Sequence, residues 1–273
     1  MSKQTPETTR AVFDAAAAHF DDPALSFFVR FGVRSVEHAA LQPGERVLDV
    51  CCGSGSSAIP AARAVGPAGA VLGVDLSDGL LSLARAKATD LGNVEFRNGD
   101  LHRLHLGAGE FDAVLCVFGF FFVDDMAAAL RSLWRAVRPG GRLLTTTWGP
   151  RVQSPLPMTV WDVVRPIRPD LVPELPRWAG IAQPEGLVKL YESAGIPSGA
   201  LSLSLEHDVH RLTDRDDLWT IVMGTGMREV VDKLTPEQQT QVREEVLSRF
   251  TAPVALDSDV IYTVARKGSS EVA

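Results

Sequence analysis

The amino-acid sequence predicts an α/β fold built on a doubly wound, mostly parallel sheet. Residues 45–75 (ERVLDVCCGSGSSAIPAARAVGPAGAVLGVD) have the pattern of a strand, a glycine turn, a helix and a second strand. Residues 111–117 form the most continuous apolar strand of the chain, which is typical of a central strand covered on both faces. A strongly amphipathic helix at 126–137 and a further strand at 142–148 follow. This order of strands and helices favours a sheet with helices on both faces.

The glycine turn follows the first strand directly. The apolar run at 47–50 indicates a strand buried on both faces. Gly53 and Gly55 then permit a sharp turn. Pro60 lacks an N–H and fits only in the first turn of a helix, so the helix begins at about residues 56–57, where two serines are good N-caps. The N-terminus of this helix is predicted to face a ligand.

An acidic residue closes the second strand. Residues 70–74 are apolar and lead to Asp75, which follows Gly55 by about 20 residues. An acid at this distance from a glycine turn is suited to bind the hydroxyl groups of a ribose. We therefore expect Asp75 to bind a nucleoside.

Two cofactors fit this turn, and a turn without any ligand is the third alternative. Residues 53–58 satisfy the loose G-x-G-x-x-G/A pattern of dinucleotide sites. Asp49 argues against a dinucleotide, because a carboxylate that points into the loop repels a pyrophosphate but attracts an ammonium group. S-adenosylmethionine (SAM) carries an ammonium group, a carboxylate for the helix N-terminus and a ribose for Asp75.

The same residues resemble a known family. The run LDVCCGSG at 48–55, followed by GVDLS at 73–77, is similar to motifs one and two of the class I SAM-dependent methyltransferases, whose common form is LDxGxGxG. Cys51 stands where the first glycine of that motif usually lies. The segment DDMAAALRSLWRAVRPGGRLL at 124–144 resembles the family's fourth-to-fifth-strand region. The resemblance covers residues 10–150 well and is architectural only beyond them.

The N-terminal segment resembles one branch of this family. Residues 13–32, FDAAAAHFDDPALSFFVRFG, are similar to the segment before motif one in the ubiquinone/menaquinone-biosynthesis-like branch (methyltransferase type 11/25). The resemblance implies a helical lid that folds over bound SAM, with Phe20 at a position that is often aromatic. The alternative is that these helices only cover the edge of the sheet.

The resemblance also implies which residues contact SAM. In the family, a strand that ends in Gly-Asp places its acid beside the adenine amino group, and Asp100 matches that position, although it could instead cap the following turn. Cys116 lies in an apolar strand and could instead belong to the core. The predicted cofactor-binding residues are Phe20, Asp49, Cys51, Gly53, Gly55, Asp75, Leu76, Asp100, Leu101 and Cys116.

Further helices and strands are expected along the chain. Two helices precede the first strand, with apolar faces formed by Val12, Ala16 and Phe20 and by Leu25, Phe28, Val29, Val33 and Val36. Residues 150–184 hold eight of the 17 prolines and are expected to form a loop over a pocket. The seven expected strands are 47–50, 70–74, 94–96, 111–117, 142–148, 201–205 and 260–265. The remaining expected helices lie within 78–91, 126–137 and 184–194, and two lie within 214–250.

The chain is expected to form a single domain with three regions. These are an N-terminal helical cap at 1–44, a SAM-binding core at 45–150, and an acceptor-side region with a helical insertion and the final strands at 151–273. The whole resembles the Rossmann-like methyltransferase fold.

Composition excludes several other classes of function. A net charge of −7 gives no basic face for nucleic acid. The longest uncharged apolar run, 113–123, is shorter than the roughly 20 residues that span a bilayer. The polar N-terminus has no secretory signal. Three cysteines form no disulfide framework and no C-x-x-C zinc motif, so we expect no metal and a cytoplasmic location. The sequence is compatible with a homo-oligomer as well as with a monomer.

The predicted function is methyl transfer from SAM to a small, largely apolar molecule, by O- or C-methylation in secondary metabolism or quinone-like biosynthesis. Phe118, Phe120 and Trp148 follow the fourth and fifth strands and are expected to form the floor of the acceptor pocket, walled by 150–184 and 214–250. If a hydroxyl is methylated, His19 or His207 is the candidate base. The alternatives are an NAD-dependent Rossmann oxidoreductase and a SAM-fold protein without methyltransferase activity.

Overall fold

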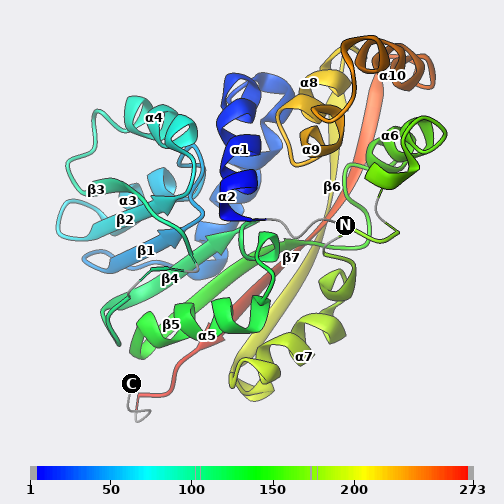
Figure 1. Cartoon of the computed structure of the whole chain (residues 1–273). Coiled ribbons are helices and arrows are strands. Elements are labelled where there is room, and N and C mark those ends of the chain that lie inside the picture. Colours follow the sequence, from blue (N-terminus) through cyan, green and yellow to red (C-terminus); the bar gives the residue numbers. More distant parts are fainter. Residues whose placement is uncertain (1–4, 102, 105, 173, 177, 270–273) are drawn as a thin grey trace.

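The chain folds around a seven-stranded sheet that carries helices on both faces (Figure 1). A computed structural model describes residues 5–269 except 102, 105, 173 and 177. The strands lie in the order β3-β2-β1-β4-β5-β7-β6, and β7 alone runs antiparallel to both neighbours. Their bounds are Arg46–Val50 (β1), Ala70–Asp75 (β2), Val94–Asn98 (β3), Phe111–Val117 (β4), Val137–Trp148 (β5), Leu201–Leu212 (β6) and Val254–Arg266 (β7). The predicted seven-stranded, mostly parallel sheet is confirmed.

The two faces of the sheet bury different residues of the same strands. Val47 and Leu115 pack against helices α2, α3 and α4 on one face, whereas Leu48 and Val114 pack on the side of α5 and α7. Side chains alternate along each strand, so a run that is apolar at every position serves both cores. The helices are α1 (Pro6–Phe20), α2 (Phe27–Ala39), α3 (Ala58–Val65), α4 (Asp78–Lys87), α5 (Met126–Ala136), α6 (Leu156–Val164), α7 (Pro184–Ser193), α8 (Asp217–Met223), α9 (Arg228–Val231) and α10 (Pro236–Ser248).

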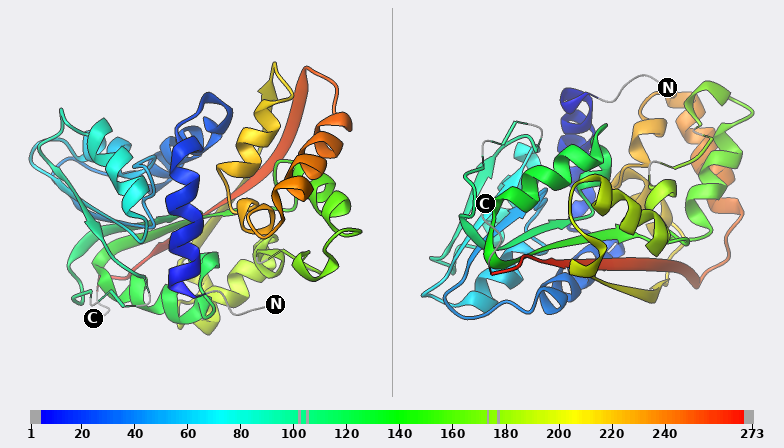
Figure 2. Two further views of the ribbon diagram at one scale, coloured as in Figure 1. Left: turned by 45° about the horizontal axis from the view of Figure 1, so that its top comes forward. Right: turned by 90° about the horizontal axis from the view of Figure 1, so that it is seen from below.

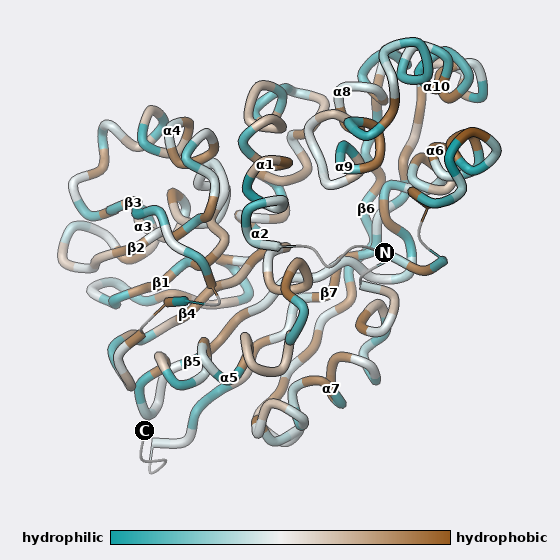
Figure 3. The backbone as a smooth tube through the Cα atoms, in the orientation of Figure 1, coloured by the Kyte–Doolittle hydropathy of each residue, from teal (hydrophilic) through white to brown (hydrophobic). Residues whose placement is uncertain are grey.

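Views from further directions show the same layers (Figure 2). In the hydropathy-coloured tube, apolar segments lie along central strands such as β5 and β7 (Figure 3). In the part of the chain described, no helix combines the length and apolarity needed to cross a membrane.

Helix α1 lies across the opening between α4 on one side and α8 and α9 on the other (Figure 1). Asp14 fixes it to the start of α4, because its carboxylate accepts hydrogen bonds from Ser77 Oγ (2.6 Å) and from the Gly79 N–H (3.1 Å). On the other side, the Arg228 guanidinium donates to the Ala15 carbonyl at 3.0 Å. Helix α1 therefore makes hydrogen bonds with both sides of the opening.

The predicted apolar face of the second helix is only partly right, because Val36 is buried but Val29 and Val33 are not. Val29 and Val33 are 52% and 38% exposed, whereas residues 27, 31, 35 and 39 are buried on β4, β5 and β7. The helix begins at Phe27 because Asp22 caps a separate 3-10 turn at Pro23–Leu25. Leu25 therefore lies outside the helix, and counting helical turns from it predicts the wrong buried face.

The acceptor-side region contains more regular structure than predicted. Helix α6 forms inside the proline-rich segment. Pro155 and Pro157 stand at its start, where backbone N–H groups have no partner within the helix, so no helical hydrogen bond is lost. Three helices, α8 to α10, occupy 214–250 instead of the two predicted. Strands β6 and β7 are longer than predicted because they pair in register from Leu201–Ala265 to Leu212–Val254. His207 therefore lies within β6 instead of following it.

A buried ion pair joins β5 to the residue that precedes β1, and the same arginine also binds the end of α2. The Arg142 side chain, 7% exposed, forms two hydrogen bonds with the Glu45 carboxylate at 2.9 and 2.6 Å. Its guanidinium also donates to the carbonyls of Ala39 and Ala40, which the end of α2 leaves without helical partners.

We predict that Arg142→Met lowers the free energy of unfolding by about 3–5 kcal/mol, because it leaves the Glu45 carboxylate buried without its cation. Arg138→Met is the matched control, since Arg138 is 48% exposed in its pair with Asp112. That control should cost less than about 1 kcal/mol. Urea unfolding measures both, and equal losses would contradict the prediction.

Candidate functional site

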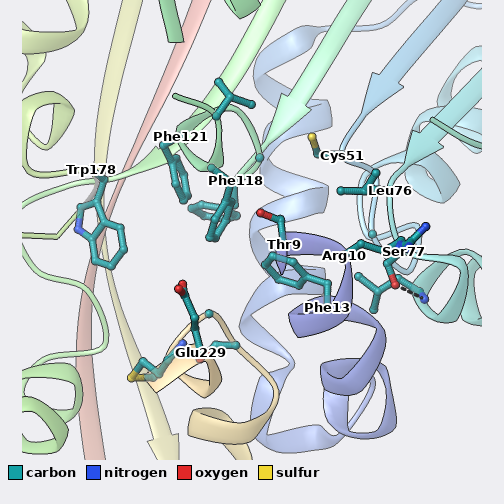
Figure 4. Close-up of a pocket in the computed structure, with 18 of the residues that line it drawn as sticks. Thr9, Arg10, Phe13, Cys51, Leu76, Ser77, Phe118, Phe121, Trp178 and Glu229 are labelled. Atoms are coloured by element: carbon teal, nitrogen blue, oxygen red, sulfur yellow. Dashed lines mark hydrogen bonds between the residues drawn. The ribbon is translucent and has the colours of Figure 1, made fainter. Parts of the chain in front are cut away.

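A cavity of about 570 Å³ opens at the carboxyl ends of the central strands. Its wall combines residues that follow β1, β2, β4 and β5 with residues of α1, the α6 region and α9. Figure 4 shows Cys51, Leu76 and Ser77 on one side of the cavity and Phe121, Trp178 and Glu229 on the other. Carboxyl ends of parallel strands are where ligands bind in doubly wound sheets.

The glycine turn has the predicted conformation. Gly53 and Gly55 have positive φ angles of +53° and +86°, and a Cβ on Gly55 would lie 2.9 Å from the Ile59 side chain. Cys51 also has a positive φ, +60°, which is rare for a residue with a side chain. A Cβ on Gly119 would lie only 2.3 Å from the Cys51 Cβ, so the glycine at 119 gives space to a cysteine in place of the motif's first glycine.

Asp75 joins the turn to the next helix. Its carboxylate accepts the Gly53 N–H at 2.8 Å and the Ser77 N–H at 2.9 Å, and it lines the cavity. Burial raises the pKa of the Asp75 carboxyl, while the backbone donors partly offset this effect. Each of the two carboxylate oxygens accepts one of these N–H groups, which leaves lone pairs for a ligand's hydroxyl groups.

Asp49 lies behind the turn and outside the cavity wall. It is fully buried, and the Ser57 hydroxyl donates to Oδ2 at 2.7 Å. Its Oδ1 has no hydrogen-bond partner among the described residues. Desolvation raises the pKa of Asp49 to about 7 from an ordinary value of 3.8.

Most of the predicted cofactor residues line the cavity together. These are Phe20, Cys51, Gly53, Asp75, Leu76, Asp100 and Leu101. Asp49, Gly55 and Cys116 do not reach it, and Cys116 is fully buried in the core. Sequence reasoning missed the contribution of α1 beyond Phe20, although Thr9 and Phe13 share a face at i, i+4 that could have indicated it.

The predicted aromatic floor is present in part. Phe118 and Trp148 line the cavity, and their rings stack with centroids 4.2 Å apart. Phe120 is fully buried and packs in the core, while Phe121 and Phe122 line the cavity. The short 3-10 turn at Phe120–Phe122 determines which of these rings points into the cavity. This turn was not predicted from the sequence.

Both predicted walls contribute to the cavity. The segment 150–184 provides Val152, Gln153, Pro157, Trp161, Asp170, Leu171, Leu175, Pro176 and Trp178. The segment 214–250 provides Thr225, Gly226, Met227, Glu229, Val230 and Lys233.

The two predicted bases lie elsewhere. Neither His19 nor His207 lines the cavity, and neither does any other histidine that the structure describes. The His207 ring instead faces two carboxylates, with Nδ1 3.2 Å from Asp259 and Nε2 3.3 Å from Asp257. Among the described residues, no group of three or more histidine, cysteine or acidic side chains is arranged to hold a metal.

Comparison with known proteins shows that the first half of the chain is similar to methyltransferases. A family model described as a methyltransferase domain matches residues 47–141. The 2-phytyl-1,4-naphtoquinone methyltransferase of Synechococcus elongatus is 36% identical over 151 residues, which are 52% of this chain and 64% of that protein. The chain thus spans less than two thirds of this relative.

Two further proteins are similar over nearly the whole chain. The nocamycin O-methyltransferase of Saccharothrix syringae is 29% identical over 93% of this chain and 97% of its own length. The crystal structure of the [4+2]-cyclase SpnF has a TM-score of 0.61 at 16% identity and covers 97% of this chain and 98% of its own. The latter likeness is one of fold.

The Asp49 environment predicts a pH-dependent stability. A carboxyl whose pKa is higher in the folded than in the unfolded state favours folding most when neutral. The contribution of Asp49 to the free energy of unfolding is complete below about pH 4 and is lost as pH rises through about 7. At pH 8, Asp49→Asn should therefore be more stable than the wild type by about 2–4 kcal/mol, whereas at pH 4 the two should match. Urea unfolding at both pH values tests this, with the exposed Asp90→Asn as control; equal stability at pH 8 would contradict it.

Proposed function

We propose that this chain, which belongs to the class I SAM-dependent methyltransferases of the ubiquinone/menaquinone-like branch, transfers a methyl group from SAM to a small, largely apolar molecule. The observation that carries the proposal is one cavity with two unlike halves. One half has the glycine turn and acidic side chains, and the other has aromatic and aliphatic walls.

The residues of the first half fit SAM. Asp75 would bind the ribose hydroxyls with the lone pairs that Gly53 and Ser77 leave. Asp100 would lie by the adenine, and Phe20 and Leu76 would cover the nucleoside. Oδ1 of Asp49 has no partner among the described residues, and the ionised form of this carboxyl behind the turn would favour the ammonium group.

The reaction requires little chemistry from the protein. SAM supplies an activated methyl group, whose sulfur leaves without charge. The protein has to hold the acceptor in line with that methyl group and exclude water. The cap formed by α1 and the stacked Phe118 and Trp148 rings are placed to do so. Since no described histidine reaches the cavity, catalysis by positioning fits this site better than catalysis by His19 or His207.

The second half of the cavity favours an apolar acceptor. Phe121, Trp161 and Trp178 contribute aromatic surface. Asp170, Glu229 and Lys233 are the charged residues that line the same half among the described residues. A relative named for a naphthoquinone supports a ring-containing acceptor, and a relative named as an O-methyltransferase supports methylation on oxygen.

The two alternatives are weaker. An NAD-dependent oxidoreductase leaves Asp49 and Asp100 unexplained, and the comparisons lend it no support. The fold of a cyclase is shared, so fold alone does not establish methylation. Formation of S-adenosylhomocysteine from SAM in the presence of reduced naphthoquinones or phenolic acceptors separates the two. A protein that binds SAM but never turns it over would be a SAM-fold protein without this activity.

We predict that the protein binds S-adenosylhomocysteine with micromolar or better affinity and binds NAD hardly at all. Asp75→Ala should weaken S-adenosylhomocysteine binding at least tenfold, because it removes charged acceptors for the ribose hydroxyls. Asp78→Ala is the matched control, since Asp78 is exposed and does not line the cavity. Calorimetry measures the binding of both ligands to the wild type and of S-adenosylhomocysteine to the two variants. NAD binding to the wild type that equals or exceeds its S-adenosylhomocysteine binding would refute the assignment.

We also predict that α1 is a lid that the cofactor orders. Thr5, Thr9, Arg10 and Phe13 of this segment line the cavity, so its stability depends on what the cavity holds. S-adenosylhomocysteine should therefore slow amide hydrogen exchange in α1. Helix α10 lines no part of the cavity and should exchange at the same rate with and without ligand. Unchanged protection in α1 would mean a fixed layer.

A further inference from the structure

One polar side chain in the cavity wall is buried without a partner. Six side-chain nitrogen or oxygen atoms in the described part of the chain are buried and make no hydrogen bond; they belong to Arg30, Asp49, Thr147, Gln153, Tyr262 and Thr263. Of these residues, Gln153 alone lines the cavity. The residue is 3% exposed, and its unpartnered atom is the amide nitrogen Nε2. A buried amide donor without a partner costs roughly 1–3 kcal/mol, so its presence at a ligand cavity calls for an acceptor there.

The backbone around Gln153 is strained and held in place. Gln153 has a φ of +47°, a backbone conformation that residues with a side chain rarely adopt. Its N–H donates to Ser258 Oγ at 3.0 Å, and Ser154 exchanges two backbone hydrogen bonds with Asp257 at 2.8 and 3.0 Å. Strain that the surroundings enforce is typical of ligand-binding positions.

The rest of the loop 149–154 is fixed to β7 as well. The Gly149 N–H donates to the Asp259 carbonyl at 2.7 Å, and a Cβ at 149 would lie 2.7 Å from the Asp259 Cβ. The Arg151 guanidinium forms two hydrogen bonds with the Asp259 carboxylate at 2.8 and 2.7 Å. His207, predicted as a base, faces the same carboxylate at 3.2 Å. The loop is thus a fixed extension of β5, and His207 belongs to its support.

The surroundings of Gln153 in the cavity are apolar. Val152 precedes it, and Pro157 and Trp161 follow within α6, all in the cavity wall. A neutral amide among such groups binds an oxygen without selecting for charge. In an apolar site, a buried polar group discriminates strongly against a ligand that leaves it unpaired.

We propose that the Gln153 side-chain amide donates a hydrogen bond to an oxygen of the methyl acceptor. The acceptor is then an apolar, ring-containing molecule that carries a carbonyl or a comparable hydrogen-bond-accepting oxygen, and Gln153 selects it over the corresponding hydrocarbon. The proposal rests on the proposed function in that it places the acceptor in this half of the cavity.

The test uses two small probes that differ by one oxygen, 1-tetralone and tetralin. Their dissociation constants are measured by ligand-observed NMR with the S-adenosylhomocysteine-saturated protein. The wild type should bind 1-tetralone more tightly than tetralin. Gln153→Leu should weaken 1-tetralone binding by about tenfold and leave tetralin binding within about twofold.

Two further variants keep the size or the chemistry of the side chain. Gln153→Glu has the same shape but places an acceptor where the donor was, so it should weaken 1-tetralone binding at least as much as leucine does. Gln153→Asn keeps a shorter amide and tolerates a positive φ, so it should retain part of the preference for the ketone. Unchanged affinity for S-adenosylhomocysteine in every variant shows that the cofactor half is intact.

Three results would overturn the proposal. The first is a wild type that binds both probes equally or binds neither. The second is that the Leu and Glu variants bind 1-tetralone as tightly as the wild type does. The third is that the variants lose affinity for both probes alike, as a purely structural role requires. Failure of the proposed function is distinct from these, because it would show as a wild-type protein that does not bind S-adenosylhomocysteine or that binds SAM without turning it over.

Discussion

The carboxylate of Asp75 is the group on which the geometry of the site depends. It stands at the end of β2 and accepts one hydrogen bond from the turn after β1 and another from the start of α4. Three segments of the first half of the chain are therefore set by one half-buried acid. Because its carboxylate accepts both N–H groups, the carboxylate position and the turn conformation depend on each other. The same oxygen atoms face the cavity, so the group that shapes the site also faces the ligand.

A second fixed point lies on the far side of the cavity. There Asp259 holds the loop after β5 through its carboxylate, its N–H and its carbonyl, and Arg151 holds the pKa of this carboxyl below its usual range. The cavity is thus built between two acids, one that organises the cofactor half and one that organises the acceptor half. Between them lie aromatic rings, which need only shape and no hydrogen bonds.

The sequence was sufficient for those parts of the molecule in which local pattern and fold agree. The strands of the parallel sheet, the glycine turn and Asp75 follow from apolar runs and from residues that only certain backbone conformations accept. The prediction failed where long-range pairing decides. Val29 and Val33 continue an apolar pattern but face outward, and β6 and β7 extend beyond their apolar cores because they pair with each other. Gln153 could not be found from the sequence, since a glutamine in a proline-rich stretch carries no local sign of burial.

The place of β7 between β5 and β6 has a consequence for how the protein assembles during synthesis. β7 is the last strand in sequence order, yet it occupies an interior position, so β5 keeps an open edge until residues 254–266 have emerged from the ribosome. The cofactor half uses residues before 102 and can form early, whereas the loop that carries Gln153 lacks its anchor until β7 arrives. A nascent chain can therefore hold a formed nucleoside site while its acceptor site is still incomplete.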